Sequence, residues 1–456
     1  MIPTLVRFIG ASLCLCVWSI QALEPFRIDI QDAENGWPVP LVELRTTHHV
    51  RFTSDNAGVI AFDLPELMGV ETWFTIEGHG YTVPKDGFGY RGVKLTPQPG
   101  GKHVVKVHRM FPAKRLGRIT GGGLFGESQK LGLEADWKEQ GILGCDSVQN
   151  ATHRGKQVWL WGDTTLARYP LGLFHMIGAT TELTPLHRFE PPVRLRYDYV
   201  LDEARKLRVV GRMPGEGPTW ISGLVSLPDA SGIGRLVATY VKIEPPLSEY
   251  ELGQCIWNDE KNVFEPHQVL WNRTADAPKM PRGTDGHVVF ETDANGATWA
   301  LFGDPFPRLR CAATVEAWSN PDAWEKLTPQ PTVRARDGTS LTPHRGSIAW
   351  NDYRNKWVSI FTQLGGKPSH LGEIWFAEAD KATGPWGPAI KVVTHENHTF
   401  YNPLMHPTFT PRGSAILLFE GTYTREFANH AQATPRHDYN QVLYRLDLDD
   451  PVFKWE

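Results

Sequence analysis

The sequence predicts an all-β protein in which a small N-terminal β-sandwich precedes a five-bladed β-propeller. Three observations lead to this prediction. The 43 glycines and 35 prolines among 456 residues suit many short strands and turns better than helical bundles. No long segment of the sequence has the periodicity of an amphipathic helix. From about residue 140 onward, one unit of strands and tight turns recurs five times.

The predicted segments are a signal peptide over 1–22, a β-sandwich over 24–115, a linker over 116–139 and a propeller over 140–456. The N-terminus has Arg7, then an apolar run to Val17, then small or neutral residues to Ala22. This pattern is typical of a secretory signal that is cleaved after Ala22. We therefore expect a secreted or periplasmic protein that is not attached to a membrane after cleavage.

Residues 24–115 alternate apolar and polar side chains with period two, and turn sequences interrupt the alternation. Short antiparallel strands of this total length fit a small sandwich. The stretches 32–36, 54–58 and 78–81 resemble the carboxypeptidase-regulatory-like, prealbumin-type accessory domains of secreted proteins. That resemblance implies a fold and says almost nothing about chemistry.

The linker contains a glycine-rich stretch, 121–128, that has the glycine spacing of a phosphate-binding loop. Glu127 occupies the position where such a loop needs its lysine, and a carboxylate there would repel phosphate. We therefore interpret this stretch as a flexible loop and predict no phosphate site.

Each of the five repeated units has a first strand, a short polar turn, an apolar second strand, a third strand and a weaker fourth. The predicted second strands are 158–164, 235–242, 298–305, 356–363 and 415–422. The predicted third strands are 175–183, 252–259, 311–319, 372–380 and 440–448. A long sandwich or a β-helix is the alternative, but the regular spacing of whole meanders favours propeller blades.

One hairpin in the first unit, from Gly144 to Thr164, carries two aspartates. An antiparallel hairpin places the start of one strand beside the end of the next, so Asp146 and Asp163 are expected at the same end. Two nearby carboxylates are what glycoside cleavage needs, one to transfer a proton and one to activate water or attack carbon. The alternative is a pair of solvated aspartates at strand ends.

The strand order also predicts which residues share one face of the propeller. First-strand starts, second-strand ends and third-strand starts lie together, away from the short turns. This predicted face collects Asp146, Asp163, His175, Trp220, Gln254, Asp285, His287, Asp304, Arg310, His344, Arg345, Glu373, His406, Glu420 and Asn440.

Two motifs carry a resemblance to a known family. Residues 372–380 followed by Gly384-Pro385-Trp386 are similar to a recurrent blade motif, and residues 159–164 resemble a tryptophan–glycine–aspartate motif. Both are found in the five-bladed propeller glycosidases of the arabinanase and β-xylosidase type. The resemblance implies a glycoside hydrolase with an aspartate pair in the first blade. Two departures are that Asp146 stands in Gly-Cys-Asp-Ser, not Ala-Asp-Pro, and that the usual third-blade glutamate has no clear match.

The sequence thus predicts a hydrolase of a polysaccharide or oligosaccharide. Asp146 would be the general base or nucleophile, and Asp163 or Glu373 the general acid, its pKa raised by burial or by a like charge. The candidate substrate-binding residues are Trp220, His287, Asp304, Arg310, Arg345, His406, Glu420, Arg436 and Asn440. Of these, Arg310 and Arg345 would hold an acidic substrate or orient a carboxylate.

Segment 434–440, which contains Arg436, is either a substrate-facing loop or a polar closure of the last blade. Two other functions stay open. One is a glycan-binding propeller without catalysis, and the other is a polysaccharide lyase that uses Tyr439 as base with Arg436 to neutralise a carboxylate.

Partners and cofactors are predicted as follows. A net charge of -4 without a Lys/Arg run argues against a nucleic-acid partner. The expected partner is a carbohydrate substrate, and the protein is expected to be a monomer. His395, His398 and His406 could bind a metal near the axis, but their irregular spacing does not predict one, and no cofactor is expected. Cys145, Cys255 and Cys311 allow at most one disulfide in the mature chain.

Overall fold

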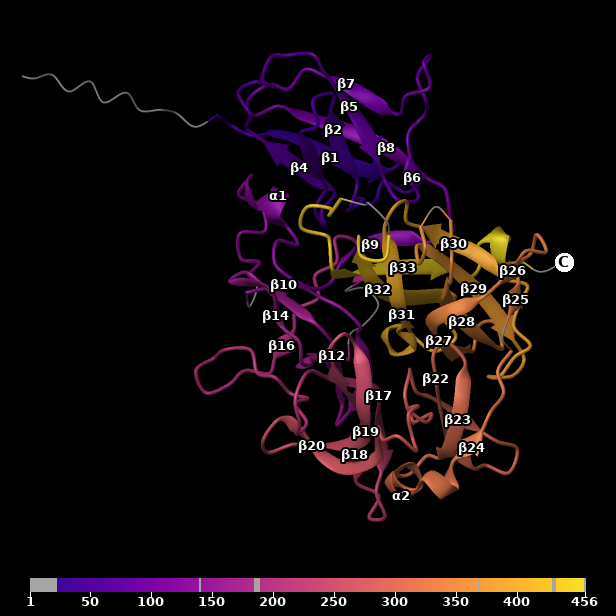
Figure 1. The fold of residues 1–456 in the computed structure, drawn as a ribbon. Coiled ribbons are helices and arrows are strands. Elements are labelled where there is room, and N and C mark those ends of the chain that lie inside the picture. The colour runs from indigo at the N-terminus through magenta and orange to yellow at the C-terminus, as the bar shows by residue number, and fades with distance from the viewer. Residues whose placement is uncertain are drawn as a thin grey trace, which may run out of the picture.

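The computed structural model describes residues 23–138, 141–183, 189–330, 332–367, 369–428 and 432–454, and over these ranges the protein is all-β with few helices (Figure 1). The predicted signal peptide, residues 1–22, lies outside the described residues. Within the described ranges, no helix combines the length and the apolar character that a membrane span requires.

The N-terminal module consists of two four-stranded sheets. One has the order β4-β1-β8-β6 and contains β1 (Phe26–Asp32), β4 (Val59–Phe62), β6 (Tyr81–Thr82) and β8 (Lys102–Arg109). The other has the order β3-β2-β5-β7 and contains β2 (Glu43–Thr46), β3 (Arg51–Thr53), β5 (Thr72–Glu77) and β7 (Gly92–Leu95). Alternate residues of both sheets, among them Ile28 and Leu44, are fully buried in one shared core.

Five further four-stranded sheets follow in chain order within the described residues. The first contains β11 (Gln149–His153), β12 (Lys156–Trp161), β15 (Ile177–Glu182) and β16 (Asp198–Tyr199). The second contains β17 (Thr219–Pro228), β18 (Gly234–Glu244), β19 (Ser248–Asn258) and β20 (Val263–Asn272). The third contains β21 (Val289–Thr292), β22 (Thr298–Gly303), β23 (Pro307–Ala312) and β24 (Glu325–Lys326).

The fourth contains β27 (Pro343–Asn351), β28 (Lys356–Gln363), β29 (Glu373–Ala379) and β30 (Ile390–Thr394). The fifth contains β31 (Thr399–Met405), β32 (Ile416–Thr424), β33 (Asn440–Asp447) and β9 (Lys114–Arg118). Each of the five predicted second strands overlaps the second strand of one sheet, because each has a long apolar run after a tight polar turn.

Smaller elements decorate these sheets. They are the strands β10 (Ile142–Cys145), β13 (Thr164–Leu166), β14 (Tyr169–Leu173), β25 (Val333–Arg334) and β26 (Ser340–Leu341), the helices α1 (Gly126–Gln129) and α2 (Val315–Ser319), and the 3₁₀ turns η2 (Pro321–Ala323), η3 (Pro407–Phe409) and η4 (Pro451–Phe453).

The structure corrects the predicted third strand of the third unit. The strand was expected over 311–319, but it spans Pro307–Ala312, and α2 follows it. Thr314 caps this helix, because its side chain accepts a hydrogen bond from the backbone N–H of Ala317. The cap therefore ends the apolar stretch as a strand and starts a helical turn.

The fifth sheet is completed by a strand from the other end of this region. Its last strand, β33, pairs with β9, which precedes the first sheet in the chain. The predicted boundary between residues 115 and 116 therefore falls inside a strand. Lys114 reinforces the pairing with an ion pair of 2.6 Å to Asp447. In Figure 1 the N-terminal module lies directly above β9 and the fifth sheet.

The first strands of all five sheets border one cavity of about 360 Å³. Its lining includes residues of β11, β17, β21, β27 and β31 or of the segments that adjoin them. Aromatic side chains fill the space between neighbouring sheets. Trp159 and Trp161 of β12, for example, are fully buried beside Phe409 and Leu443 of the fifth sheet region. The five first strands thus surround a common central space.

Cys145, Cys255 and Cys311 are all buried and unpaired, so the disulfide that the sequence left open does not form among them. The predicted flexible loop is a packed connection. Leu124 and Phe125 are buried against Trp137, and Glu127 of α1 accepts a hydrogen bond from the backbone N–H of Ala61 at 3.0 Å. Glu127 therefore ties α1 to the N-terminal module.

Candidate active site

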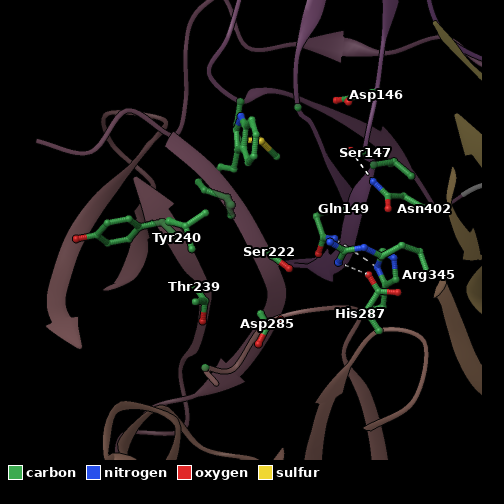
Figure 2. A pocket seen from close by; sticks show the side chains of 18 of the residues that line it. Asp146, Ser147, Gln149, Ser222, Thr239, Tyr240, Asp285, His287, Arg345 and Asn402 are labelled. Atoms are coloured by element: carbon green, nitrogen blue, oxygen red, sulfur yellow. Dashed lines mark hydrogen bonds and ion pairs between the residues drawn. The ribbon is translucent and has the colours of Figure 1, made fainter. Parts of the chain in front are cut away.

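A second cavity, of about 300 Å³, lies beside the central one and contains most of the acidic residues of the predicted face. The residues that line it come from the first, second and third sheets and the loops beside them, from β27 of the fourth sheet and from β31 of the fifth. Figure 2 shows Asp146, Asp285 and Arg345 arranged around this space. The predicted site residues in its lining are Asp146, Asp163, Trp220, His287, Asp304 and Arg345.

Asp146 and Asp163 are paired through their backbones, as the predicted hairpin requires. The N–H of Asp146 donates to the carbonyl oxygen of Asp163 at 3.1 Å, and the N–H of Gly162 donates to that of Asp146 at 2.9 Å. Residue 162 must be small, because a Cβ there would lie 2.5 Å from Oδ1 of Asp146. The glycine thus lets the Asp146 carboxylate lie against the strand end that carries Asp163.

The Asp146 carboxylate is held by hydroxyl donors. Tyr401 of β31 donates to Oδ2 of Asp146 at 2.7 Å. Burial raises the pKa of Asp146 to about 6, while hydrogen bonds from Tyr401, Tyr439 and Ser147 oppose the rise. Burial and the Asp146 charge raise the pKa of the Tyr401 hydroxyl well above its usual value, so it stays a donor. Near neutral pH, Asp146 is therefore ionised and oriented.

Asp163 has a different environment from Asp146. Burial and the neighbouring charge of Asp146 raise the pKa of Asp163 to about 7, and a hydrogen bond with the Trp220 side chain opposes this rise. Its Oδ1 is buried and has no hydrogen-bond partner in the described residues. Two like charges in one site disfavour double ionisation, so the pair keeps one proton over part of the neutral range.

Three residues around Asp146 have left-handed backbone conformations, which non-glycine residues seldom adopt. They are Ser147 (φ 51°), Asn402 (φ 50°) and Tyr439 (φ 60°). Asn402 donates to Oγ of Ser147 at 2.7 Å, and Thr422 accepts from the Ser147 backbone N–H at 3.1 Å. Such conformations persist only where the surroundings hold them, and they are concentrated at functional sites.

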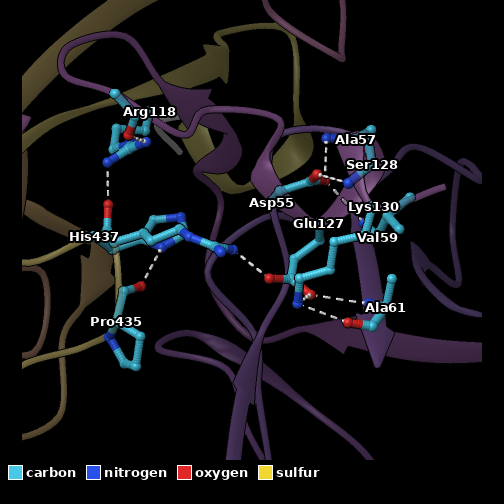
Figure 3. A network of polar contacts seen from close by, with 12 residues as sticks. Asp55, Ala57, Val59, Ala61, Arg118, Glu127, Ser128, Lys130, Pro435 and His437 are labelled. Carbon is cyan, nitrogen blue, oxygen red and sulfur yellow. Dashed lines mark hydrogen bonds and ion pairs between the residues drawn. The ribbon is translucent and has the colours of Figure 1, made fainter. Parts of the chain in front are cut away.

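The loop that carries Tyr439 is held by the N-terminal module (Figure 3). Arg436 forms an ion pair with Glu127 of α1, and Glu127 also accepts from Nζ of Lys130 at 2.9 Å. The α1 helix is itself docked on the module, because Asp55 accepts a hydrogen bond from the Ser128 backbone N–H at 2.7 Å. The module therefore reaches the Asp146 region through a chain of contacts that ends at the 434–440 loop.

The opposite wall of the cavity carries Asp285, Asp304 and Arg345. Asp304 accepts from Arg345 at 2.9 Å and from the Gly346 backbone N–H at 2.6 Å. Asp285 is exposed to solvent, yet partial burial of its carboxyl group in the cavity raises its pKa. The charge of Asp304 adds to the rise, and Arg345 and Arg308 oppose it. Arg345 is thus already neutralised by a carboxylate.

Glycine contacts set the position of Asp285. A Cβ on Gly286 would lie 2.2 Å from the carbonyl oxygen of Gly303, and a Cβ on Gly223 would lie 2.0 Å from that of Thr284. The backbones of the second and third sheets can therefore approach closely, and Ser222 accepts the Gly286 N–H at 2.7 Å.

His287 separates the two cavities together with Gln149. Both residues line both cavities, and Nε2 of Gln149 lies 3.4 Å from Nδ1 of His287. Burial lowers the pKa of His287, so its imidazole is neutral at physiological pH.

Other predicted site residues do not line the acidic cavity. The Glu373 carboxylate binds Lys391 at 2.8 Å and the Lys367 backbone N–H at 3.0 Å. Arg310 forms an ion pair of 2.7 Å with Glu325 and lies over the Trp299 ring. These side chains satisfy one another within the fourth and third sheets.

The remaining predicted residues have structural partners too. His406 and Glu420 form a buried pair at 2.7 Å, and burial raises the pKa of Glu420 while His406 opposes the rise. Asn440 donates to the carbonyl oxygen of Leu143 at 3.1 Å and supports the strand that leads to Asp146. Arg436 is engaged by Glu127 and does not line the cavity.

The prediction missed Tyr401, Ser147 and Asn402, which contact or adjoin Asp146. Tyr401 lies 255 positions along the chain from Asp146, so no local pattern joins them. One indication of Tyr401 was present in the sequence, namely its place on the first strand of the fifth unit, since the starts of first strands were expected on the face that carries the site.

The histidines considered for a metal have other roles. His395 contacts the Tyr444 hydroxyl at 2.8 Å, and His398 contacts the carbonyl oxygen of Gln432 at 2.9 Å. His406 lies elsewhere, on Glu420. Throughout the described ranges, no group of three or more His, Cys, Asp or Glu side chains is arranged to hold a metal ion.

No known protein family and no curated protein matches the sequence. Solved structures resemble the chain distantly. An exo-1,5-α-L-arabinanase from a bovine ruminal metagenomic library is 10% identical, with a TM-score of 0.40 over 68% of this chain and 94% of that one. A putative exo-β-1,3-galactanase from Bifidobacterium bifidum s17 is 12% identical, with a TM-score of 0.39 over 67% and 92%.

An N-acetylgalactosamine deacetylase from F. plautii, in complex with blood group B trisaccharide, is 9% identical, with a TM-score of 0.37 over 68% of this chain and 91% of that one. Likenesses this distant determine neither the activity nor the site residues of the chain. The function must therefore be inferred from the geometry of the acidic cavity.

Proposed function

We propose that the protein is a secreted glycoside hydrolase, and that its five sheets are the blades of a propeller whose acidic cavity is the active site. The observation that carries this proposal is the Asp146–Asp163 pair. The two aspartates share one strand end, line one cavity and have raised pKa values of about 6 and about 7. Burial and mutual repulsion separate an acid from a base in this way at many hydrolytic sites.

The hydroxyl donors decide the roles within the pair. Asp146 is stabilised as a carboxylate by Tyr401 and becomes the general base or nucleophile. Asp163, with an unpartnered Oδ1, holds the shared proton and gives it to the leaving glycosidic oxygen. In a direct displacement, Asp146 takes a proton from water as the water oxygen bonds to the anomeric carbon. In a double displacement, Asp146 bonds to that carbon first. Water then replaces Asp146 on the carbon, and Asp163, deprotonated in the first step, takes the proton of that water.

The other walls would hold the sugar. Trp220 lies beside Asp163 and offers an aromatic face for a sugar ring. Asp285 and the Asp304–Arg345 pair offer acceptors and donors for hydroxyl groups. Glu373 has no part in this proposal, because its carboxylate is occupied by Lys391.

The test is hydrolysis of a panel of neutral, carboxylated and sulfated glycans with analysis of the products. We expect wild type to release reducing ends from at least one glycan. Asp146→Asn and Asp163→Asn should each lose about 10²–10⁴-fold in kcat, which is the usual contribution of a general acid or base. Asp380→Asn, an equal change at an exposed residue that pairs with Lys356, should retain full activity.

The outcomes separate the proposal from its rivals. The anomeric configuration of the first product, followed by NMR, reports retention or inversion. Binding without turnover across the panel would instead support a non-catalytic glycan-binding protein. An unsaturated, ultraviolet-absorbing product would indicate a lyase, although Arg436, the neutralising arginine of that alternative, is engaged by Glu127.

Export is part of the proposal, because a polysaccharide cannot enter the cell intact. Expression of the full chain should give a mature protein outside the cytoplasm whose first residue is Leu23. Retention of residues 1–22 on a protein found in the cytoplasm would contradict export.

A further inference from the structure

A groove of about 800 Å³ adjoins the acidic cavity, and Met280 lines both. Its wall is formed by the third sheet, η2 and the loops before the third and fourth sheets. Phe306 and Leu309 are buried beneath it, while Trp324 is half-buried. The groove therefore continues the cavity along one side and has an apolar floor.

The charges of the groove are opposite to those of the cavity. Arg282, Arg308 and Lys326 line the groove, and none of the acidic residues that the structure describes does. The carboxylates that line the cavity are Asp146, Asp163, Glu249, Asp285 and Asp304, and its lining contains one arginine, Arg345. A cleft lined by charges of one sign attracts and concentrates ligands of the opposite charge.

The three cations of the groove are also unpaired within the described residues. Each is exposed, and none forms an ion pair or a side-chain hydrogen bond within the described part of the chain. Neighbouring arginines behave differently, because Arg310 is paired with Glu325 and Arg345 with Asp304. Three like charges around one groove repel one another, and an anionic ligand would relieve that repulsion.

The groove and the cavity are close enough to serve one ligand. Arg308 acts electrostatically on Asp285, which lines the cavity. A polymer that crosses Met280 would pass from Arg308 to Asp285 and then toward the aspartate pair. Its unit in the cavity must be neutral, since the carboxyl groups in the cavity lining outnumber its one arginine and would repel an anion.

We propose that this groove binds anionic units of the polysaccharide substrate, so that a neutral sugar is cleaved in the cavity while neighbouring sugars place carboxylate or sulfate groups on Arg282, Arg308 and Lys326. This inference rests on the proposed glycosidase activity. The anion-binding role that the sequence placed on Arg310 and Arg345 passes to these three residues, because they, unlike Arg310 and Arg345, have no carboxylate partner in the described residues.

The test compares the wild type with the triple variant Arg282→Ala/Arg308→Ala/Lys326→Ala. The matched control is Arg205→Ala/Lys206→Ala/Lys381→Ala, which removes three exposed cations outside the groove. Binding is measured calorimetrically with a polygalacturonate, a sulfated galactan and a neutral galactan at low and high salt. Hydrolysis of a short neutral oligosaccharide, chosen from the glycan panel, is measured in parallel.

We expect wild type and control to bind one of the two anionic polymers, and the groove variant to bind it at least tenfold more weakly, about 1.4 kcal/mol. The salt dependence of affinity should also become shallower in that variant. Its turnover of the short neutral substrate should stay at the wild-type level. The preferred polymer, carboxylated or sulfated, identifies the anionic group.

Equal affinity of wild type and groove variant for the anionic polymers would overturn the inference. Wild-type binding of the neutral galactan as tight as that of the anionic polymers would overturn it too. The single variant Lys326→Ala, which removes an exposed side chain, provides a second measurement if the triple variant is unstable. If the wild type hydrolysed no glycan of the panel, the proposed function would be wrong, but the binding measurement would still decide whether the groove binds anionic polymers.

Discussion

Removal of the Tyr401 hydroxyl offers the sharpest test of the aspartate pair. In the wild type this hydroxyl donates to Oδ2 of Asp146 at 2.7 Å and stabilises the ionised carboxylate. A hydrogen bond to a charged group contributes about 1.5–3 kcal/mol, and one pKa unit corresponds to about 1.4 kcal/mol. Tyr401→Phe should therefore raise the pKa of Asp146 by about 1–2 units, nearer the lower figure because Tyr439 and Ser147 still donate.

The sign of the effect on activity is set by the role of Asp146. Asp146 works as a carboxylate, so its pKa of about 6 sets the acidic limb of the pH profile. In Tyr401→Phe that limb should move upward toward the pKa of about 7 held by Asp163. The window in which Asp146 is ionised and Asp163 protonated then narrows, and the maximal kcat/KM falls.

The assay is kcat/KM against pH on the best substrate of the panel, together with a carbon-13 NMR titration of the aspartate carboxyl groups. Tyr240→Phe is the matched control, because Tyr240 also lines the cavity but donates to Glu251 at 2.8 Å. If a folded Tyr401→Phe protein kept the wild-type limb and the same titration, Asp146 would not be the group that the hydroxyl stabilises.

The same contacts lead to three further predictions. Gly162→Ala places a Cβ 2.5 Å from the Asp146 carboxylate, so kcat should fall roughly 10–100-fold with the fold retained, whereas Gly87→Ala, in open space, should be neutral in assay and thermal melt. Asp163→Asn should stabilise the protein at pH 8. A carboxyl group whose pKa is raised by folding destabilises the folded state once it ionises, and asparagine cannot ionise. The full pKa shift corresponds to ~4 kcal/mol, and solvent in the cavity reduces the expected gain in the free energy of unfolding to about 1 kcal/mol. This gain should vanish near pH 4, where Asp163 is protonated in the folded wild type. Equal melting temperatures of wild type and Asp163→Asn at pH 8 would contradict the raised pKa of Asp163. Arg436→Ala removes the ion pair that holds the loop carrying Tyr439, so the acidic limb of the pH profile should shift upward, as it should in Tyr439→Phe. Arg436→Lys should restore part of the wild-type profile. A change in stability without a shift of this limb would limit Arg436 to a structural role.

Local patterns in the sequence were sufficient for the repeated sheets. Strand periodicity and tight polar turns depend on neighbouring residues, so the five second strands were located within a few positions. The same reasoning failed at 311–319, where Thr314 caps a helix directly after a strand. An apolar stretch of nine residues contains no signal that separates these two outcomes except the cap itself.

The partners of charged residues required the folded chain. Glu373 and Arg310 are paired with Lys391 and Glu325, which the sequence did not place beside them, whereas Arg345 is paired with Asp304, which shares the predicted face. Conversely, Arg282, Arg308 and Lys326 form a cluster because a loop, a strand and a short edge strand converge. Neither pairing nor clustering has a periodicity that can be read along the chain.

The sequence by itself determined that the protein is built from β-strands and that one hairpin joins Asp146 to Asp163. These properties depend on interactions between residues close in the chain. Only the tertiary structure decided that Tyr401 and the Tyr439 loop hold Asp146, and that the N-terminal module holds that loop through Glu127. Burial and hydrogen bonding at the pair arise from segments hundreds of residues apart, so the chemical state of the two carboxyl groups exists only in the folded chain.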